Sequence, residues 1–487
     1  MNDIPKEVIA VVALLKHEGF EAYLVGGCVR DVLMEKKPKD WDVTTNALPD
    51  DIQRIFPHTF YENDFGTVGV VNDDATDPTL AVIEVTPYRT ESGYSDKRHP
   101  DSVSFGTSLK EDLKRRDFTM NAIALDPLTG DIEDPHKGQA DIEKKTIRTV
   151  GSAEERFLED ALRIMRAVRF AAELDFDLAE ETTTAIRALH TGLSDISAER
   201  IRDEFTKLIL SPNPRKGIEL LYELHLLSYV APEVEEGVNV KQNQAHSYGV
   251  FEHIVRTLQA AADKNATLEV RLAALFHDIA KPHTKEFSEK NDDWSFHGHD
   301  VVGARITRKR LQALRYPNDV VATVTKLVRW HMFFSDTDEI THSAVRRLIR
   351  NVGTENIKNI LLLRVCDRIG TGRPKEEPYR LRKYQSMIEE VMRDPVSVSM
   401  LTVNGEDIMK LLDEKGSPRI GWILHALLEE VLDDPKRNTK DYLENRAKEL
   451  ALLSADELKK LGEAGKDVRE EAEAEELKKI RSKYFVE

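Results

Sequence analysis

The chain has 487 residues and a formal charge of −17, from 70 lysines and arginines against 87 aspartates and glutamates. Single hydrophobic cores stop growing near about 250–300 residues, so this length predicts several domains. The two cysteines, Cys28 and Cys366, lie far apart in sequence, which argues against a disulfide framework and favours a reducing compartment. No apolar run reaches the roughly 18 residues of a membrane span, and no signal-peptide pattern opens the chain. We therefore expect a cytoplasmic protein with no membrane partner.

The segment Glu21–Val43 holds the first candidate site. It reads EAYLVGGCVRDVLMEKKPKDWDV and predicts a short strand, a Gly26-Gly27 turn, an amphipathic helix and a second strand. Residues two apart on a strand share a face, so Asp40 and Asp42 are expected side by side. Two such carboxylates repel each other unless a hard cation lies between them. The alternative is a surface Asp-x-Asp pair beside a purely structural turn.

The hydrophobic pattern changes once along the chain. Up to about Gly151, apolar runs typical of strands alternate with short helical stretches, and from Ser152 the apolar residues recur at helical spacing. We therefore predict the α+β class, with a mixed sheet in an N-terminal head and an almost wholly helical remainder. The expected strands are Ala22–Val25, Trp41–Thr44, Val68–Val71, Ala81–Tyr88 and Ala122–Leu125.

Several motifs, in order, resemble those of the class II nucleotidyltransferases, which include the tRNA CCA-adding enzymes and poly(A) polymerases. After LVGG-x-VRD and Asp-x-Asp come RRDFTMNA (115–122), GDIEDPHKG (130–138), EDALRIMRAVRF (159–170), ISAERIRDEFTKLIL (196–210) and GSPRIGWILHALLEEV (416–431). The resemblance implies a nucleotidyltransferase head at 1–151, a helical neck or RNA-binding region at 152–240, and a helical, tRNA-binding body and tail at 376–487. Residues 241–375 follow another pattern.

The same resemblance implies addition of CCA to the 3′ end of tRNA from CTP and ATP at a two-metal site. Asp40 and Asp42 are then expected to hold Mg²⁺, with Glu84 as the candidate third carboxylate. Glu84 also fits a solvated position on a strand. No template strand and no DNA partner are expected.

The triphosphate is assigned to the glycine turn and two arginines. Gly26 and Gly27 bring backbone N–H groups to a helix N-terminus, which suits a phosphate. Arg30 and Arg116 are expected to contact the triphosphate. The alternative for Arg116 is an ion pair with an aspartate at position 112 or 117.

Base selection is assigned to the fourth motif. Asp160 and Arg163 stand three apart on the expected helix and therefore on one face. A carboxylate only accepts hydrogen bonds and a guanidinium only donates them, which fits the edges shared by cytosine and adenine and rejects uracil and guanine. Arg166 and Arg169 continue this face and are expected to support the base or the triphosphate. The alternative is a salt-bridged surface helix, since glutamates at 155, 159 and 173 lie nearby.

The segment Tyr88–Phe105 is rich in Gly, Ser, Asp and charge, and is interpreted as a mobile loop. In CCA-adding enzymes a flexible loop at this place is associated with the switch from C to A addition, so its presence favours full CCA addition. Poly(A) polymerases of the class carry a basic GRRF-like stretch, where this chain has YENDFGTVGVV (61–71). The remaining alternative is an A-adding enzyme or a poly(A) polymerase.

Residues 242–372 are rich in histidine and resemble the HD metal-dependent phosphohydrolase domain. The matching residues are His253, the adjacent His277 and Asp278, and Asp367, while His299 (or His297) and His331 are candidates for a second metal or a phosphate. Such ligands suit Ni²⁺, Mn²⁺, Co²⁺, Zn²⁺ or Mg²⁺. The resemblance implies phosphatase or 2′,3′-cyclic phosphodiesterase activity. The alternative is a non-catalytic module that is structural or docks RNA.

The net negative charge is unusual for a protein that binds RNA. Acidic residues concentrate in segments such as Glu470–Glu476, whereas basic residues cluster in the family motifs and at Arg346, Arg347 and Arg350. We therefore expect a basic groove on an acidic body.

Overall fold

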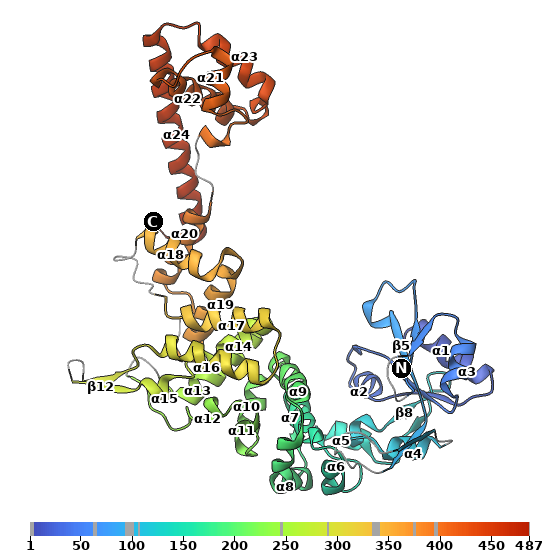
Figure 1. Cartoon of the computed structure of the whole chain (residues 1–487). Helices are drawn as coiled ribbons and strands as arrows, with labels where there is room; N and C mark the ends of the chain where they lie inside the picture. Colours follow the sequence, from blue (N-terminus) through green and yellow to red (C-terminus); the bar gives the residue numbers. More distant parts are fainter. Residues whose placement is uncertain are drawn as a thin grey trace. The chain divides into compact units, whose positions relative to one another are not determined.

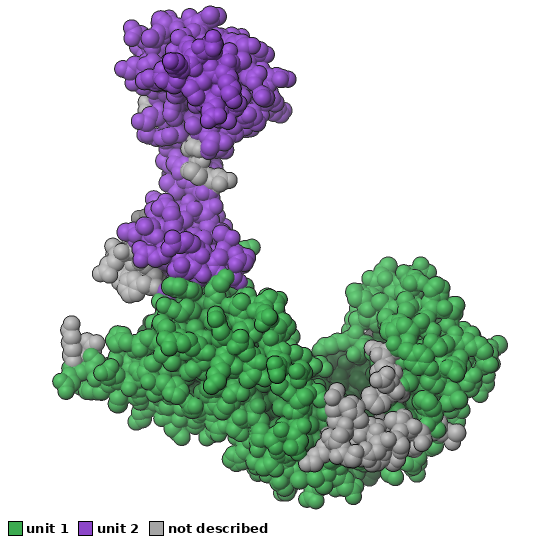
Figure 2. Space-filling model, viewed as in Figure 1, with its two compact units in different colours: residues 1–332, 358–374 green, residues 333–357, 375–487 purple. Residues whose placement is uncertain are grey.

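The computed structural model describes residues 4–61, 66–92, 102–105, 108–243, 247–289, 292–333, 341–373, 376–393 and 398–486. The chain divides into two compact units (Figure 2), residues 1–332 with 358–374, and residues 333–357 with 375–487. Residues 333–357, which the sequence-based boundaries group with the histidine-rich segment, thus belong to the second unit. Among the described helices, none has both the length and the apolar character that crossing a membrane requires.

The first unit begins with a seven-stranded mixed sheet in the order β3-β4-β5-β2-β1-β8-β9. Two of its strands, β5 and β8, are labelled in Figure 1. Helices α1 and α3 pack on one face, where Val12, Leu24, Val43, Ile83 and Val85 contribute to one buried core. The strands are β1 (Ala22–Val25), β2 (Asp42–Thr45), β3 (Thr59–Tyr61), β4 (Val68–Val71), β5 (Val82–Pro87), β8 (Ala124–Leu125) and β9 (Ile132–Glu133). The helical elements here are α1 (Lys6–His17), α2 (Gly27–Leu33), α3 (Pro49–Ile55), α4 (Leu109–Lys114), α5 (Gly138–Glu143), η1 (Pro78–Leu80) and η2 (Thr119–Asn121).

The five expected strands are all present, and the mixed sheet is confirmed. The last of them is shorter than predicted, because residues 119–121 form the 3₁₀ turn η2 and leave only Ala124–Leu125 in the sheet. The expected loop Tyr88–Phe105 is wrong at its ends, where β6 (Arg89–Ser92) pairs antiparallel with β7 (Ser102–Phe105). Its central residues, 93–101, lie outside the described residues.

The described residues of the remainder of the first unit are helical apart from two small pairs of strands. β10 (Thr146–Ile147) pairs in parallel with β11 (Asp177–Leu178), and β12 (Glu286–Ser288) forms a hairpin with β13 (Asp293–Ser295). Strands of two or three residues are too short to show an alternating pattern, so the sequence did not reveal them. The helices are α6 (Ala153–Glu159), α7 (Leu162–Leu174), α8 (Glu180–Leu189), η3 (His190–Asp195), α9 (Ala198–Leu210), α10 (Pro214–Glu223), α11 (Leu227–Val230), α12 (Pro232–Glu235), α13 (Val250–Asp263), α14 (Leu268–Phe276), α15 (Lys281–Thr284), α16 (His299–Ala313), α17 (Asn318–Trp330) and α19 (Ile357–Gly370).

The second unit is helical throughout its described residues. It comprises α18 (His342–Val352), η4 (Thr354–Asn356), α20 (Tyr379–Met392), η5 (Val398–Met400), α21 (Gly405–Leu412), α22 (Pro418–Asp433), η6 (Pro435–Arg437), α23 (Lys440–Leu450) and α24 (Ala455–Lys483). The densely charged C-terminal segment forms α24, which packs along α22. Two glycines permit this close packing, because a Cβ atom at Gly462 would lie 2.6 Å from the Trp422 side chain and one at Gly465 would lie 2.4 Å from the His425 carbonyl oxygen.

Candidate functional site

The polar face of the head sheet borders a pocket of about 520 Å³. Most of the head residues predicted from the sequence line it, together with residues that the sequence did not single out. The predicted residues in the lining are Gly26, Gly27, Arg30, Asp40, Asp42, Arg116, Arg166 and Arg169, and the additional ones include Asp31, Lys39, Asp117, Asn121, Phe170 and Glu173. Glu84, Asp160 and Arg163 are not part of this lining.

The carboxylates of the pocket are positioned by the strand next to the core. Trp41 is 2% exposed and packs in the core, so the next residue, Asp42, is directed to the opposite side, and Asp40 also lines the pocket. The prediction that both lie on one strand is wrong, because β2 begins at Asp42 and Asp40 lies in a bend ahead of it. Glu84 on β5 is the register partner of Asp42, and alternation places both on the face opposite Val43 and Val85. The sheet therefore puts two carboxylates side by side, with Asp40 close to them.

The glycine turn lets these groups approach each other. Gly26 has φ 78° and ψ −140°, a conformation that residues with a Cβ atom rarely adopt. A Cβ atom there would lie 3.1 Å from Asp42 Oδ2 and 3.3 Å from Arg116 Nη1, and one at Gly27 would lie 4.0 Å from Asp40 Oδ1. Gly26 is thus required both by its backbone conformation and by the space it leaves open at the pocket, whereas a Cβ atom at Gly27 would make only ordinary contacts.

The two arginines assigned to the triphosphate are anchored by protein groups. Arg30 is buried, donates to Asn121 Oδ1 at 3.0 Å and pairs with Asp31 at 2.7 Å. Arg116 Nη2 lies 3.3 Å from Asp112 Oδ2, so the alternative ion pair with Asp112 is present. Both guanidiniums nevertheless line the pocket, where they supply positive charge opposite the carboxylates.

The fourth motif contains a break that the sequence did not show. Helix α6 ends at Glu159 and α7 begins at Leu162, while Asp160 between them has φ −147° and ψ 106°. The prediction that Asp160 and Arg163 share one face of one helix is therefore wrong. Asp160 Oδ1 accepts from the Leu162 N–H at 3.0 Å, and such local bonds favour helix starts over helix interiors.

Ion pairs hold the charged residues of this motif. Asp160 pairs with Arg200 at 2.6 Å, and Arg163 pairs with Glu159 and donates to the Arg156 carbonyl at 3.1 Å. The alternative of a salt-bridged helix is therefore correct for Arg163, because its partner Glu159 is one of the glutamates named from the sequence.

Arg166 and Arg169 link α7 to other parts of the unit. Arg166 Nη2 lies 2.6 Å from Asp117 Oδ2, and Arg169 pairs with Glu204 at 2.6 Å and Glu173 at 2.7 Å. Burial alone would raise the pKa of Asp117, but the guanidiniums of Arg166 and Arg163 lower it to about 2. Asp117 belongs to the motif RRDFTMNA, so the sequence contained a pattern from which it could have been predicted. The sequence around Glu204 contains no pattern that predicts its pairing with Arg169.

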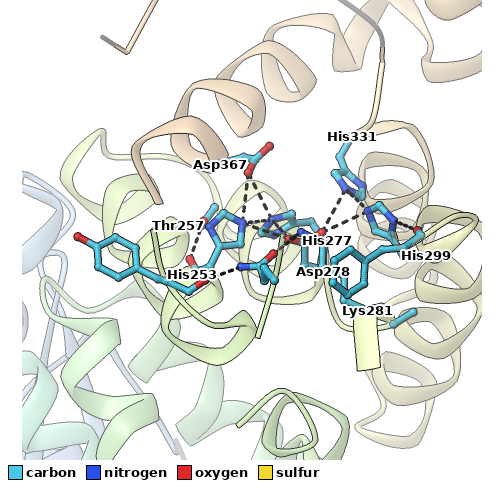
Figure 3. A network of polar contacts seen from close by, with 12 residues as sticks. His253, Thr257, His277, Asp278, Lys281, His299, His331 and Asp367 are labelled. Atoms are coloured by element: carbon cyan, nitrogen blue, oxygen red, sulfur yellow. Dashed lines mark hydrogen bonds and ion pairs between the residues drawn. The ribbon is translucent and has the colours of Figure 1, made fainter. Parts of the chain in front are cut away.

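The second candidate site is a buried cluster of histidines and aspartates (Figure 3). Two groups of three residues have ligand atoms within 4.8 Å of one another. The first is His253, His277 and Asp367, from α13, the end of α14 and α19, and the second is Asp278, His299 and His331, from the end of α14, α16 and the end of α17. The six residues include the four of the predicted HD signature. His297, the alternative to His299, is exposed and belongs to neither group.

Asp278 lies between the two groups. Its Oδ2 atom is 3.1 Å from His253 Nε2 and 3.3 Å from His277 Nε2. Its Oδ1 atom is 3.3 Å from His299 Nε2 and 3.6 Å from His331 Nε2. One carboxylate thus faces both groups with different oxygens, which is the arrangement of a bridging ligand.

Backbone contacts orient three of the imidazoles. The Nδ1 atoms of His277, His299 and His331 lie 2.8, 2.6 and 2.7 Å from backbone carbonyl oxygens. A carbonyl only accepts, so each Nδ1 carries a hydrogen, and Nε2 is the ring nitrogen that faces the cluster and can bind a metal ion. The Nε2 atoms of His299 and His331 are only 3.3 Å apart, a contact that requires either a proton between them or a cation beside them. Imidazole and carboxylate donors arranged in this way fit two divalent metal ions.

Charged neighbours that the sequence did not single out complete the cluster. Lys281 Nζ lies 2.6 Å from Asp278 Oδ2, and Arg364 Nη1 lies 2.7 Å from Asp367 Oδ2. Burial would raise the pKa of both aspartates, but the surrounding positive groups hold it well below its usual range. Burial would lower the pKa of His253, whereas its bonds to the two aspartates raise it to about 9. Asp278 and Asp367 are therefore ionised, as carboxylate ligands of a metal ion must be.

Three protein families match successive parts of the chain. Residues 22–148 match the family described as "Poly A polymerase head domain", residues 175–237 "Probable RNA and SrmB- binding site of polymerase A", and residues 250–372 the HD domain. The HD match contains all six residues of the buried cluster.

Named relatives cover the chain almost completely. The CCA-adding enzyme of Geobacillus stearothermophilus is 34% identical over 442 residues, 90% of this chain and 95% of that enzyme. A solved structure of the Bacillus stearothermophilus CCA-adding enzyme in complex with CTP is 31% identical, covers 92% of this chain and 98% of that one, and superposes with a TM-score of 0.62. The CCA-adding enzyme of Geobacillus thermodenitrificans is 45% identical over 439 residues, 90% of this chain and 95% of that enzyme. With this identity over nearly the whole length of both proteins, the chain belongs to the family of CCA-adding enzymes.

Proposed function

We propose that this protein adds CCA to the 3′ end of tRNA, using CTP and ATP as substrates. The observation that carries the proposal is the pocket in which Asp40 and Asp42 lie beside the Gly26-Gly27 turn, in a chain whose near full-length relatives are CCA-adding enzymes. The alternative of an A-adding enzyme or a poly(A) polymerase is not favoured, because both of these relatives are named CCA-adding enzymes. The two free cysteines are consistent with the cytoplasm, where tRNA is processed.

In this proposal, Asp40, Asp42 and Glu84 hold Mg²⁺. When bound, the metal supplies Lewis-acid activation of the attacking 3′-oxygen and neutralises charge on the leaving pyrophosphate. Arg30 and Arg116 position the triphosphate, since both guanidiniums are fixed by protein contacts and line the pocket. Catalysis then depends mainly on positioning and on charge stabilisation by groups that are already in place.

Asp160 and Arg163 remain our candidates for reading the base. Their side chains come from the α6–α7 junction, and α7 also carries two arginines of the pocket lining. Partners such as Arg200 and Glu159 hold the two side chains in fixed orientations, which is what selective recognition of one base edge requires.

Replacing Asp160 with alanine is expected to relax base selection more than it weakens nucleotide binding. Loss of one base-reading contact corresponds to roughly 1–3 kcal/mol, or about ten- to a hundred-fold in discrimination. Incorporation of UTP and GTP relative to CTP and ATP measures the effect. Arg200→Ala is the matched control, because it removes the partner of Asp160 and keeps the carboxylate. An equal loss for all four nucleotides in Asp160→Ala would assign Asp160 to structure or phosphate binding.

For the buried cluster we propose a phosphohydrolase site that acts on phosphate monoesters or 2′,3′-cyclic phosphates. The four HD residues together with His299 and His331 would hold two divalent ions, for which Ni²⁺, Mn²⁺ and Co²⁺ are the candidates. A bound pair of ions supplies a hydroxide nucleophile and neutralises the phosphate. Lys281 and Arg364 orient the bridging and terminal aspartates. The alternative of a non-catalytic module predicts that the metal-loaded protein hydrolyses neither substrate class.

The main proposal is tested with tRNA that lacks its 3′ CCA. The protein is incubated with CTP alone, ATP alone and both nucleotides, and the products are sized to one nucleotide. We expect extension by two nucleotides with CTP alone and by three with both nucleotides. Long adenosine tails, or no incorporation of C, would refute the proposal.

A further inference from the structure

Helix α18 carries an exposed arginine face in a chain whose formal charge is −17. The helix reads HSAVRRLIRNV and contains no acidic residue. Arg346, Arg347 and Arg350 are all exposed, and at 100° per residue they fall within one third of the helix circumference. Val345, Leu348 and Val352 form the opposite, buried face. The three guanidiniums therefore point away from the core of the second unit.

These arginines lack the acidic partners that most neighbouring cations have. Within the described part of the chain, none of the three makes an ion pair or a hydrogen bond. Both glutamates of α20, the helix that packs against α18, pair with other cations, and so does Glu473 on α24. Glu389 lies 2.7 Å from Lys483, Glu390 lies 3.1 Å from Arg481, and Glu473 pairs with Arg393. Among the described residues of the second unit, no acidic side chain therefore pairs with the three arginines of α18.

Local stability does not account for this arrangement. A cation in the last turn of a helix interacts favourably with the helix dipole, which explains Arg350. Arg346 and Arg347 lie earlier in the helix, and each repels Arg350, because like charges three or four residues apart on a helix are neighbours. Three unpaired arginines on one face therefore cost stability slightly unless an anion is bound.

We propose that this face of α18 docks the sugar-phosphate backbone of tRNA. Arginine presents a planar fork of donors that matches a phosphate, and three forks along little more than one helical turn fit successive phosphates better than a single small anion. The contact reads charge and spacing, not sequence, so it holds the tRNA without selecting a base. The inference rests on the proposed function for its partner, and it adds a docking site in the second unit, outside both candidate active sites.

The test measures binding of end-labelled tRNA lacking CCA, without nucleotides, as a function of KCl concentration. In R346Q/R347Q/R350Q we expect about tenfold weaker binding at low salt and a shallower dependence of log K on log salt. Each phosphate contact contributes about 0.7–0.9 to that slope, so three contacts should lower it by about 2–3. The variant R346K/R347K/R350K keeps the charges and should retain most of the slope. Thermal unfolding of each variant confirms that the second unit is folded.

Two controls remove the same charge elsewhere. K459Q/K466Q/K479Q lies on α24, where each lysine is within 4.0 Å of a glutamate, and should leave the slope unchanged. R305Q/R308Q/K309Q removes an exposed basic group on α16 of the first unit and tests whether any such group has the same effect. An unchanged slope in the α18 glutamine variant, or an equal loss in either control, overturns the proposal. A parent protein that binds tRNA but adds no nucleotides would instead refute the proposed function and leave this measurement valid.

Discussion

Replacing Asp42 with alanine should abolish nucleotide addition while leaving the fold intact, and Asp40→Ala should do the same. Asp42 is the register partner of Glu84 and lies beside the glycine turn, so its carboxylate is central to the proposed Mg²⁺ site. Loss of such pre-organised charge stabilisation costs about 10³-fold in rate, equivalent to roughly 4 kcal/mol. Single-turnover addition of CMP to tRNA lacking CCA is the appropriate measurement.

Stability provides an independent readout for the same variants. Removing one carboxylate from a group of like charges relieves repulsion, so the free energy of unfolding should be unchanged or slightly higher. Asp42→Asn keeps the size of the side chain and should be as inactive as the alanine variant. Asp50→Asn makes the same charge change at an exposed position of the head and should remain active. Near-normal activity in both Asp40→Ala and Asp42→Ala would show that the metal ions bind elsewhere.

Replacing His277 and Asp278 together with alanine should eliminate hydrolysis of 2′,3′-cyclic phosphates and reduce bound transition metal. Asp278 contacts both halves of the cluster, so its loss disrupts both proposed ions at once. The buried Lys281 would then lose its carboxylate partner, and an uncompensated buried charge costs about 3–5 kcal/mol. Asp278→Asn is therefore the better variant, because an amide retains an acceptor for Lys281 and removes the bridging charge.

Metal content per chain and hydrolysis should be measured after loading with Ni²⁺, Mn²⁺, Co²⁺ and Mg²⁺ separately. CCA addition by the same preparations should stay within a few-fold of the parent, because independent sites couple weakly. His283→Ala is the matched control, since His283 lies on α15 of the same domain but pairs with Glu236 outside the cluster. A parent protein that hydrolyses nothing with any metal would disprove the phosphohydrolase claim. Loss of CCA addition in a folded Asp278→Asn variant would show instead that the domain serves the transferase.

Local chemistry in the sequence was sufficient for much of the fold. The short apolar run Ala22–Val25 and the glycine turn after it predicted β1 and the start of α2, because strand length and glycine conformation are local properties. The change to helical periodicity after Ser152 predicted the helical remainder for the same reason. The histidine and aspartate residues of the cluster were found from the order and type of their motif, and the structure brings them together.

The partners of these residues were decided by the tertiary structure. Asp42 and Glu84 are 42 positions apart, and only the parallel pairing of β2 with β5 makes them neighbours. Helix α6 ends at Glu159, and the Asp160 side chain accepts a hydrogen bond from the Leu162 N–H at the start of the next helix. The hydrophobic periodicity of the sequence does not reveal such a break.

By itself, the sequence determined the family, the α+β class and most of the residue types at both candidate sites, because motifs and hydrophobic periodicity are properties of neighbouring residues. Only the tertiary structure decided that Asp278 faces two groups of ligands and that α24 packs closely on α22 through Gly462 and Gly465. It also directs Glu389 and Glu390 of α20 to other cations, so that no described acidic residue pairs with the arginine face of α18. These features depend on which distant segments of the chain come into contact. Those contacts are determined jointly by the burial of apolar residues and by charge pairing over the whole chain.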